Sequence, residues 1–115
     1  MVDTYTPNRG DIVWAELKNP KGHEQKGRRS FLILSTKKYN EESHFAIACP
    51  ITSQVKGYLF EVFISLNEIE GSILLNQLTS IDFKYRNTKF IEKLDVNTTK
   101  EIGEYFAGAL KGFDR

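Results

Sequence analysis

The stretch RSFLILS, from Arg29 to Ser35, decides the fold. It is a continuous apolar run of strand length, which is typical of a central β-strand buried on both faces. A second run, FAIACPIT, from Phe45 to Thr52, predicts another buried strand. Pro50 restricts the end of that strand to an edge or a bulge, because proline cannot donate to a sheet ladder. Together the two runs predict a buried sheet at the centre of the fold.

Further short strands are expected over the first ninety or so residues. In Leu59–Leu66 the even-numbered positions are apolar and share one face of a predicted strand. Lys56-Gly57-Tyr58 and Glu70-Gly71 are typical of turns. The other predicted strands are Gly10–Leu17, Ser72–Ile81 and Thr88–Leu94.

The pattern changes to a helical period near the C-terminus. Thr98-x-x-Glu101 matches a capping box, and Gly112 marks a possible helix end. The apolar positions with helical spacing are Val96, Ile102, Tyr105, Phe106, Ala109 and Leu110. The face of Tyr105, Phe106 and Leu110 is expected to lie in the core or at a dimer interface. The fold class is therefore mainly β with a C-terminal helix (α+β), a small curved sheet or partial barrel, with residues 1–115 as one domain.

Composition excludes several classes of protein. Hydrophobic residues make up 40% and charged residues 27% of 115 residues, which is typical of a globular protein and not of a disordered one. The N-terminus has no signal-peptide pattern, and no apolar run approaches the ~20 residues of a membrane helix. Cys49 is the only cysteine, so we expect a buried thiol in a reducing, cytoplasmic setting and no membrane partner.

Charge is distributed unevenly although the net charge is only +1. Seven basic residues and one acid lie between Lys18 and Lys38, and a second basic group contains Lys84, Arg86 and Lys89. Such a distribution is compatible with binding a polyanion. It is equally compatible with a solvated, lysine-rich loop.

Motifs for nucleotide binding, zinc binding and two-metal chemistry are missing, so neither a metal nor a cofactor is expected. His23 and His44 could form an acid–base pair, but both stand beside glutamates in segments expected at the surface. Three polar segments remain as candidate ligand sites, although each alone is equally typical of strand caps and turns. They are Gly22–Arg29, Pro50–Gln54 and Asn76–Asp82.

These segments, in this order and spacing, resemble the MazF/PemK family of toxins. The similarity covers almost the whole chain and is carried by six motifs: Tyr5-x-Pro7-x-Arg9-Gly10-Asp11-Ile12-Val13-Trp14, Gly22-x-Glu24-Gln25-x-Gly27-x-Arg29, Pro50-Ile51-Thr52-Ser53-Gln54, Lys56-Gly57-Tyr58-x-Phe60-Glu61-Val62, Glu70-Gly71 and Gln77-Leu78-x-Ser80-Ile81-Asp82. Two family prolines are replaced here, one by Ser30 directly after the arginine and one by Leu59.

The resemblance implies an SH3-like β-barrel of the PemK/CcdB type, a symmetric homodimer and a cognate MazE-like antitoxin. It also implies a ribonuclease that cuts single-stranded RNA by attack of the 2′-hydroxyl, leaving a 2′,3′-cyclic phosphate and a 5′-hydroxyl. The family's catalytic positions carry over to Arg29 and Thr52, and its loop motif to Glu24 and Gln25.

The residue types agree with that chemistry. Arg29 offers a planar fork of donors to phosphate oxygens, and Thr52 can add one further hydrogen bond. Glu24 is the candidate base, since an arginine stays protonated. The candidate RNA contacts, each also readable as a solvated polar residue, are Gln25, Arg28, Ser53, Gln54, Lys56, Gln77, Lys84 and Arg86.

Two alternatives remain open at this point. The first is a CcdB-like toxin that acts by binding a protein, although that group ends in Trp-Gly-Ile and this chain ends in Gly112-Phe113-Asp114-Arg115. The second is a non-catalytic RNA- or protein-binding barrel whose site has decayed through Ser30.

Overall fold

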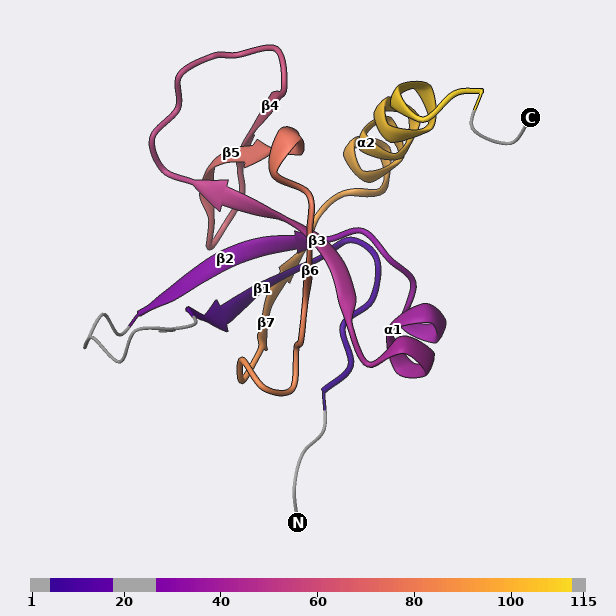
Figure 1. Ribbon diagram of the computed structural model, residues 1–115. Coiled ribbons are helices and arrows are strands. Elements are labelled where there is room, and N and C mark those ends of the chain that lie inside the picture. Colours follow the sequence, from indigo (N-terminus) through magenta and orange to yellow (C-terminus); the bar gives the residue numbers. More distant parts are fainter. Residues whose placement is uncertain (1–4, 18–26, 113–115) are drawn as a thin grey trace.

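The computed structural model describes residues 5–17 and 27–112, which form a twisted antiparallel sheet flanked by helices (Figure 1). The strands are β1 (Asp11–Glu16), β2 (Arg28–Ile33), β3 (Ala46–Thr52), β4 (Glu61–Ser65), β5 (Glu70–Leu74), β6 (Thr79–Ile81) and β7 (Lys89–Lys93). The helices are α1 (Lys37–Ser43), the single 3-10 turn η1 (Leu75–Gln77) and α2 (Val96–Ala109). The predicted class, mainly β with a C-terminal helix, is confirmed.

Strand β3 pairs with three other strands of the sheet. The strand order is β4-β5-β3-β2-β1-β7, and β6 also pairs with β3. Along one side β3 pairs with β2; along the other it pairs first with β6, through residues 46–48, and then with β5, through residues 51–52. Pro50 falls between these last two pairings, where its missing N–H leaves no ladder bond unmade. The expectation for the end of this strand agrees with the register: β3 is an interior strand up to Pro50, and beyond it residues 51–52 pair only with β5.

The two ends of the strand order are brought together by one carboxylate. Glu92 of β7 accepts hydrogen bonds from the backbone N–H groups of Glu68, at 2.7 Å, and Ile69, at 3.1 Å, in the connection between β4 and β5. The sheet thereby curls into a partial barrel, which matches the predicted curvature.

The sheet buries apolar side chains on both faces. The inner cluster contains Ile12, Leu32 and Cys49 from the central strands, with Ile73 from β5 and Ile102 from α2. The outer cluster consists of Val13, Ala15, Phe31, Ile33, Ala46, Ala48, Ile81 and Phe83, against which Tyr5 packs. This arrangement confirms the expectation from RSFLILS, since alternate residues of β2 enter opposite clusters.

Helix α1 was not expected, because the sequence predicts only strands in this half of the chain. It is seven residues long, and only Asn40 is buried, so it carries no apolar period. Thr36 caps its first turn by accepting from Tyr39 N, and His44 ends it in the left-handed conformation. His44 is thus a helix-ending residue at the surface.

Two further predictions are wrong. Glu70 and Gly71 lie inside β5 instead of forming a turn, and Leu66 N–H to Ile69 C=O closes the hairpin before them. The predicted strand Ser72–Ile81 is divided into β5 and β6 by η1. The strands predicted at Gly10–Leu17 and Thr88–Leu94 are confirmed as β1 and β7.

Helix α2 begins three residues earlier than the predicted capping box. Asp95 is the N-cap, because its carboxylate accepts from Thr98 N at 2.8 Å, and this hydrogen bond holds the pKa of Asp95 below its ordinary value. Only Ile102 of α2 is buried, while Tyr105 and Leu110 are exposed. The helix therefore packs on the sheet through Ile102 and the half-buried Phe106, and leaves Val96, Tyr105 and the following Leu110 uncovered. No helix in the described parts of the chain is long and apolar enough to cross a bilayer.

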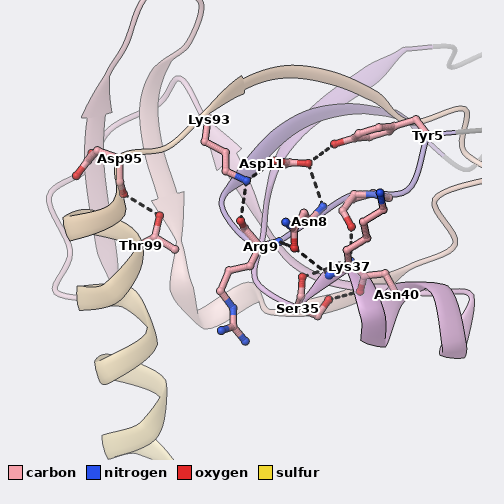
Figure 2. Close-up of polar contacts among 11 residues, drawn as sticks. Tyr5, Asn8, Arg9, Asp11, Ser35, Lys37, Asn40, Lys93, Asp95 and Thr99 are labelled. Atoms are coloured by element: carbon pink, nitrogen blue, oxygen red, sulfur yellow. Dashed lines mark hydrogen bonds and ion pairs between the residues drawn. The ribbon is translucent and has the colours of Figure 1, made fainter.

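A polar network ties the N-terminal segment to the start of α1 and the end of β7 (Figure 2). The buried carboxylate of Asp11 accepts from Tyr5 OH at 2.6 Å, from Asn8 N at 3.0 Å and from Lys93 Nζ at 2.8 Å. Asn40 of α1 is fully buried and donates to Pro7 O at 2.8 Å. These bonds anchor the first described residues on the sheet.

Candidate functional site

Arg29 lies on β2, directly opposite Ala15 of β1. Side chains alternate along a strand, so Arg29 is on the same face as Phe31 and the outer cluster. Arg28 is on the opposite face, where its guanidinium lies 4.6 Å from the ring centroid of Trp14. The two neighbouring arginines therefore serve different surfaces. Trp14 is half-buried and supports Arg28 as well as packing against the inner cluster.

Ser30, which replaces a proline in the family pattern, is buried in β2 opposite Trp14. The β1–β2 pairing continues without a register shift from Ile12↔Leu32 to Glu16↔Arg28. Pairing on both sides of position 30 thus holds Arg29 in place, with no need for the restricted backbone of proline.

Thr52 is the last residue of β3 and is half-buried. The last β2–β3 pair is Phe31↔Pro50. Because the strands are antiparallel, Arg29, two residues before Phe31, and Thr52, two residues after Pro50, lie at adjacent strand ends. The Thr52 hydroxyl oxygen accepts from Gln54 N at 3.1 Å. Its proton is therefore directed away from this contact and is available to a ligand.

The loop after Thr52 contains Ser53, Gln54 and Lys56, which are all exposed. The loop extends beyond the sheet in Figure 1, between β3 and β4. Glu61 organises it, since its carboxylate accepts from Lys56 N at 3.1 Å and Gly57 N at 3.0 Å. This anchoring role was not predicted; the only sequence signal is a carboxylate four residues after a glycine in a turn.

Gln77 ends η1 and is exposed. The first residue of η1, Leu75, donates its N–H to Phe60 O at 2.9 Å, just before β4 begins. Gln77 is therefore attached to the same end of the molecule as the loop after Thr52.

Lys84 and Arg86 lie in the connection between β6 and β7. Arg86 donates from Nη1 to Glu16 O at 3.1 Å, and Glu16 N donates to Arg86 O at 2.8 Å, so this connection is joined to the end of β1. Arg86 lies near the Glu16–Arg28 pair, while Lys84 is exposed. Glu24 and Gln25 lie outside the described residues.

The predicted residues thus form two groups at neighbouring strand ends. One contains Arg28, Arg29 and Arg86 around the ends of β1 and β2, with Arg28 on the opposite face of the sheet from Arg29; the other contains Thr52, Ser53, Gln54, Lys56 and Gln77 around the end of β3. Lys84, exposed in the β6–β7 connection, belongs to neither group. A guanidinium and a hydroxyl at adjacent strand ends can donate hydrogen bonds to the same phosphate group. Among the described residues, no group of three or more potential metal-ligating side chains occurs. Cys49 is buried, as predicted, and burial raises the pKa of its thiol to about 12.

A separate groove of about 960 Å³ runs between α2 and the sheet. Its apolar wall includes Leu34, Ile47, Leu78, Phe106 and Leu110. Figure 2 shows part of its polar wall, where Lys93 and Thr99 lie near the start of α2 and Asn8 and Arg9 lie between them and α1. None of the predicted site residues lines this groove.

The curled sheet, its C-terminal helix and the hydrogen-bond donors at adjacent strand ends define a small β-barrel protein. Residues 8–110 match the family described as PemK-like, MazF-like toxin of type II toxin–antitoxin system. The chain belongs to this family, as its motifs predict.

Two relatives and one solved structure agree. The endoribonuclease toxin MazF of Escherichia coli (strain K12) is 40% identical over 86 residues, covering 75% of this chain and 78% of the relative. Endoribonuclease EndoA of Bacillus subtilis (strain 168) is 31% identical over 102 residues, covering 84% and 87%. The MazE–MazF crystal structure (Form-II) from Deinococcus radiodurans superposes with a TM-score of 0.86 at 32% identity, covering 95% of this chain and 99% of that chain.

Proposed function

We propose that this chain is a sequence-specific, metal-independent endoribonuclease toxin that cuts single-stranded RNA, with mRNA as the expected target. Family membership supports this, because the relatives are named endoribonucleases. The observation that carries the chemical proposal is the placement of Arg29 and Thr52 at the ends of adjacent strands, two residues beyond the last β2–β3 pair.

In the proposed reaction the ribose 2′-oxygen attacks the adjacent phosphorus. The 2′-hydroxyl proton goes to a base, the new 2′-O–P bond forms, and the P–O5′ bond breaks as the 5′-oxygen gains a proton. Arg29 and Thr52 donate hydrogen bonds to the non-bridging oxygens, where charge develops in the transition state. Because Arg29 is permanently cationic, it can neutralise this charge without a metal ion. Glu24 is proposed as the base.

RNA recognition is assigned to the two groups of polar residues around these strand ends, together with Lys84 in the β6–β7 connection and Gln25, which lies outside the described residues. Phosphate contacts are proposed for the basic members and base contacts for the amide and hydroxyl members. The full set is Gln25, Arg28, Ser53, Gln54, Lys56, Gln77, Lys84 and Arg86. The stacking of Arg28 on Trp14 gives one of these cations a fixed orientation.

The chain is also proposed to form a homodimer and to be inhibited by a MazE-like antitoxin. The uncovered apolar residues of α2 support the dimer, since Leu110 is 62% exposed and Tyr105 43% exposed. Relatives were crystallised as MazE–MazF complexes, which supports an antitoxin partner. An acidic antitoxin segment would suit the cationic strand ends.

The deciding experiment is incubation of the purified protein with a long single-stranded RNA in excess EDTA, followed by mapping of the product ends. We expect cuts at a recurring short sequence with cyclic-phosphate ends. Arg29→Ala should lower the cleavage rate by roughly 10²–10³-fold, and Arg29→Lys should restore little of it because lysine lacks the planar fork. Lys38→Ala, an exposed change on α1, is the control. No cleavage by the wild-type protein would favour a binding-only barrel.

A further inference from the structure

Ser72 of β5 carries a buried hydroxyl with no hydrogen-bond partner. Its side chain has 0% exposure, and its Oγ is one of two such orphan side-chain atoms among the described residues; the other is Thr88 Oγ1. Burying a hydroxyl without a partner costs free energy, so such a group calls for an explanation.

The strand register places Ser72 between two side chains on its own face of the sheet. Thr52 of β3 is directly opposite on one side, and Phe63 of β4 is directly opposite on the other. Opposed residues in antiparallel strands have Cβ atoms about 4.5–5.5 Å apart, and Thr–Ser pairs in this position commonly hydrogen bond. Phe63 offers no such partner, so Thr52 is the residue opposite Ser72 in the register that carries a hydroxyl, and the two side chains form no hydrogen bond in this structure.

The neighbouring glycine fixes this geometry. A Cβ atom at Gly71 would lie 2.4 Å from the carbonyl oxygen of Thr52, which no side chain can tolerate. β5 therefore lies directly against Thr52 at this point. The Thr52 hydroxyl already accepts from Gln54 N, which leaves one lone pair and one proton for further bonds.

We infer that Ser72 is a positioning residue for Thr52. This rests on the proposed function, in which the Thr52 hydroxyl donates to a non-bridging phosphate oxygen. When phosphate takes that proton, Ser72 donates to the remaining lone pair of Thr52 Oγ1. The Thr52 hydroxyl is then held by two donors and can direct its proton only at the phosphate. A chain of hydrogen bonds of this kind also strengthens each member.

The test uses Ser72→Ala in the full-length protein, with Thr88→Val as the matched control that removes the other orphan hydroxyl. The substrate is a short RNA containing one cleavage sequence mapped on the long transcript. We expect Ser72→Ala to lower the single-turnover cleavage rate about 3–10-fold, the effect of one neutral hydrogen bond. Binding of the same RNA with a 2′-deoxy residue at the cut should stay within twofold, and Thr88→Val should cleave at the wild-type rate.

If Ser72 acts through Thr52, a second result is expected. In a Thr52→Val background, Ser72→Ala should have no further effect on the residual rate, because the hydroxyl it positions is gone. Ser72→Cys, which keeps a weak donor in a slightly larger side chain, should recover part of the rate relative to Ser72→Ala. A wild-type rate for Ser72→Ala, or an undiminished fall in the Thr52→Val background, would overturn the inference while leaving the proposed function intact. Absence of cleavage by the unmodified protein would instead overturn both.

Discussion

Replacing Tyr5 with phenylalanine is expected to destabilise the protein at neutral pH. Tyr5 donates to the carboxylate of Asp11 at 2.6 Å, and Asp11 is 6% exposed. A hydrogen bond to a charged group contributes about 1.5–3 kcal/mol. Asp11 keeps its bonds from Asn8 N and Lys93 Nζ in the variant, so it is not left unpaired. We therefore expect the free energy of unfolding to fall by about 2 kcal/mol at pH 8.

The same bond gives the effect a pH dependence. Burial, and then the hydrogen bond to Asp11, raise the pKa of Tyr5 far above its ordinary value of 10.0. A raised pKa means that the folded state keeps a proton that the unfolded state loses, so the stabilisation is complete below pH 10 and declines as the pH rises. Without solvent screening, the free energy of unfolding would fall by about 1.4 kcal/mol for each pH unit above 10. Because the phenol is only half-buried, screening lowers this effect, and we expect a loss of roughly 1 kcal/mol at pH 11.

The assay is urea unfolding of wild type and Tyr5→Phe at pH 8 and pH 11, at one protein concentration because dimerisation would couple stability to concentration. The difference between the two proteins should shrink by roughly 1 kcal/mol at the higher pH. Any alkaline effect of the Cys49 thiol is common to both proteins and cancels. Tyr85→Phe, at a site 70% exposed, should be neutral at both values. An equal difference at pH 8 and pH 11 would refute the reasoning.

Three further outcomes follow from the structure. Cys49, buried with its pKa raised to about 12, should resist alkylation by iodoacetamide in the native protein and react only after unfolding; rapid native labelling would contradict its placement. Glu92→Ala should lower the free energy of unfolding by about 1–3 kcal/mol, measured in urea, since two backbone N–H groups lose their acceptor; Glu92→Gln should lose less. Changing Lys84 and Arg86 together to alanine should flatten the salt dependence of RNA binding, and an unchanged slope would count against phosphate contacts there.

Continuous runs of apolar residues predicted the central strands well. RSFLILS and FAIACPIT are buried runs, and both form central strands. Helix α1 could not be predicted in this way, because its only buried side chain is the polar Asn40. The start of α2 was placed too late because Thr98-x-x-Glu101 satisfies the capping-box pattern, while Asp95 satisfies the geometry. A local motif cannot distinguish between two residues that can both cap a helix.

The candidate site was likewise predicted only in part from the sequence. Arg29 and Thr52 were identified by family resemblance, and the structure places them at adjacent strand ends. Glu61 and Ser72 were not predicted, since their roles depend on which residues lie across a loop or an adjacent strand. Cross-strand register depends on the whole sheet, and no spacing within one segment reveals it.

The change of partners along β3 links the fold to the chemistry. Both β2 and β3 continue past the Phe31–Pro50 pair, but β3 then pairs with β5 instead, and the two strands diverge (Figure 1). Pro50 suits this point because it has no N–H to leave unsatisfied between two neighbours. In a continuous ladder, the backbones of Arg29 and Thr52 would be joined to each other. Where the strands separate, each remains held by a different neighbour, Ala15 or Ser72, and both side chains can donate to a group that enters between them. The change of partners along β3 therefore also separates the two strand ends between which the phosphate is proposed to bind.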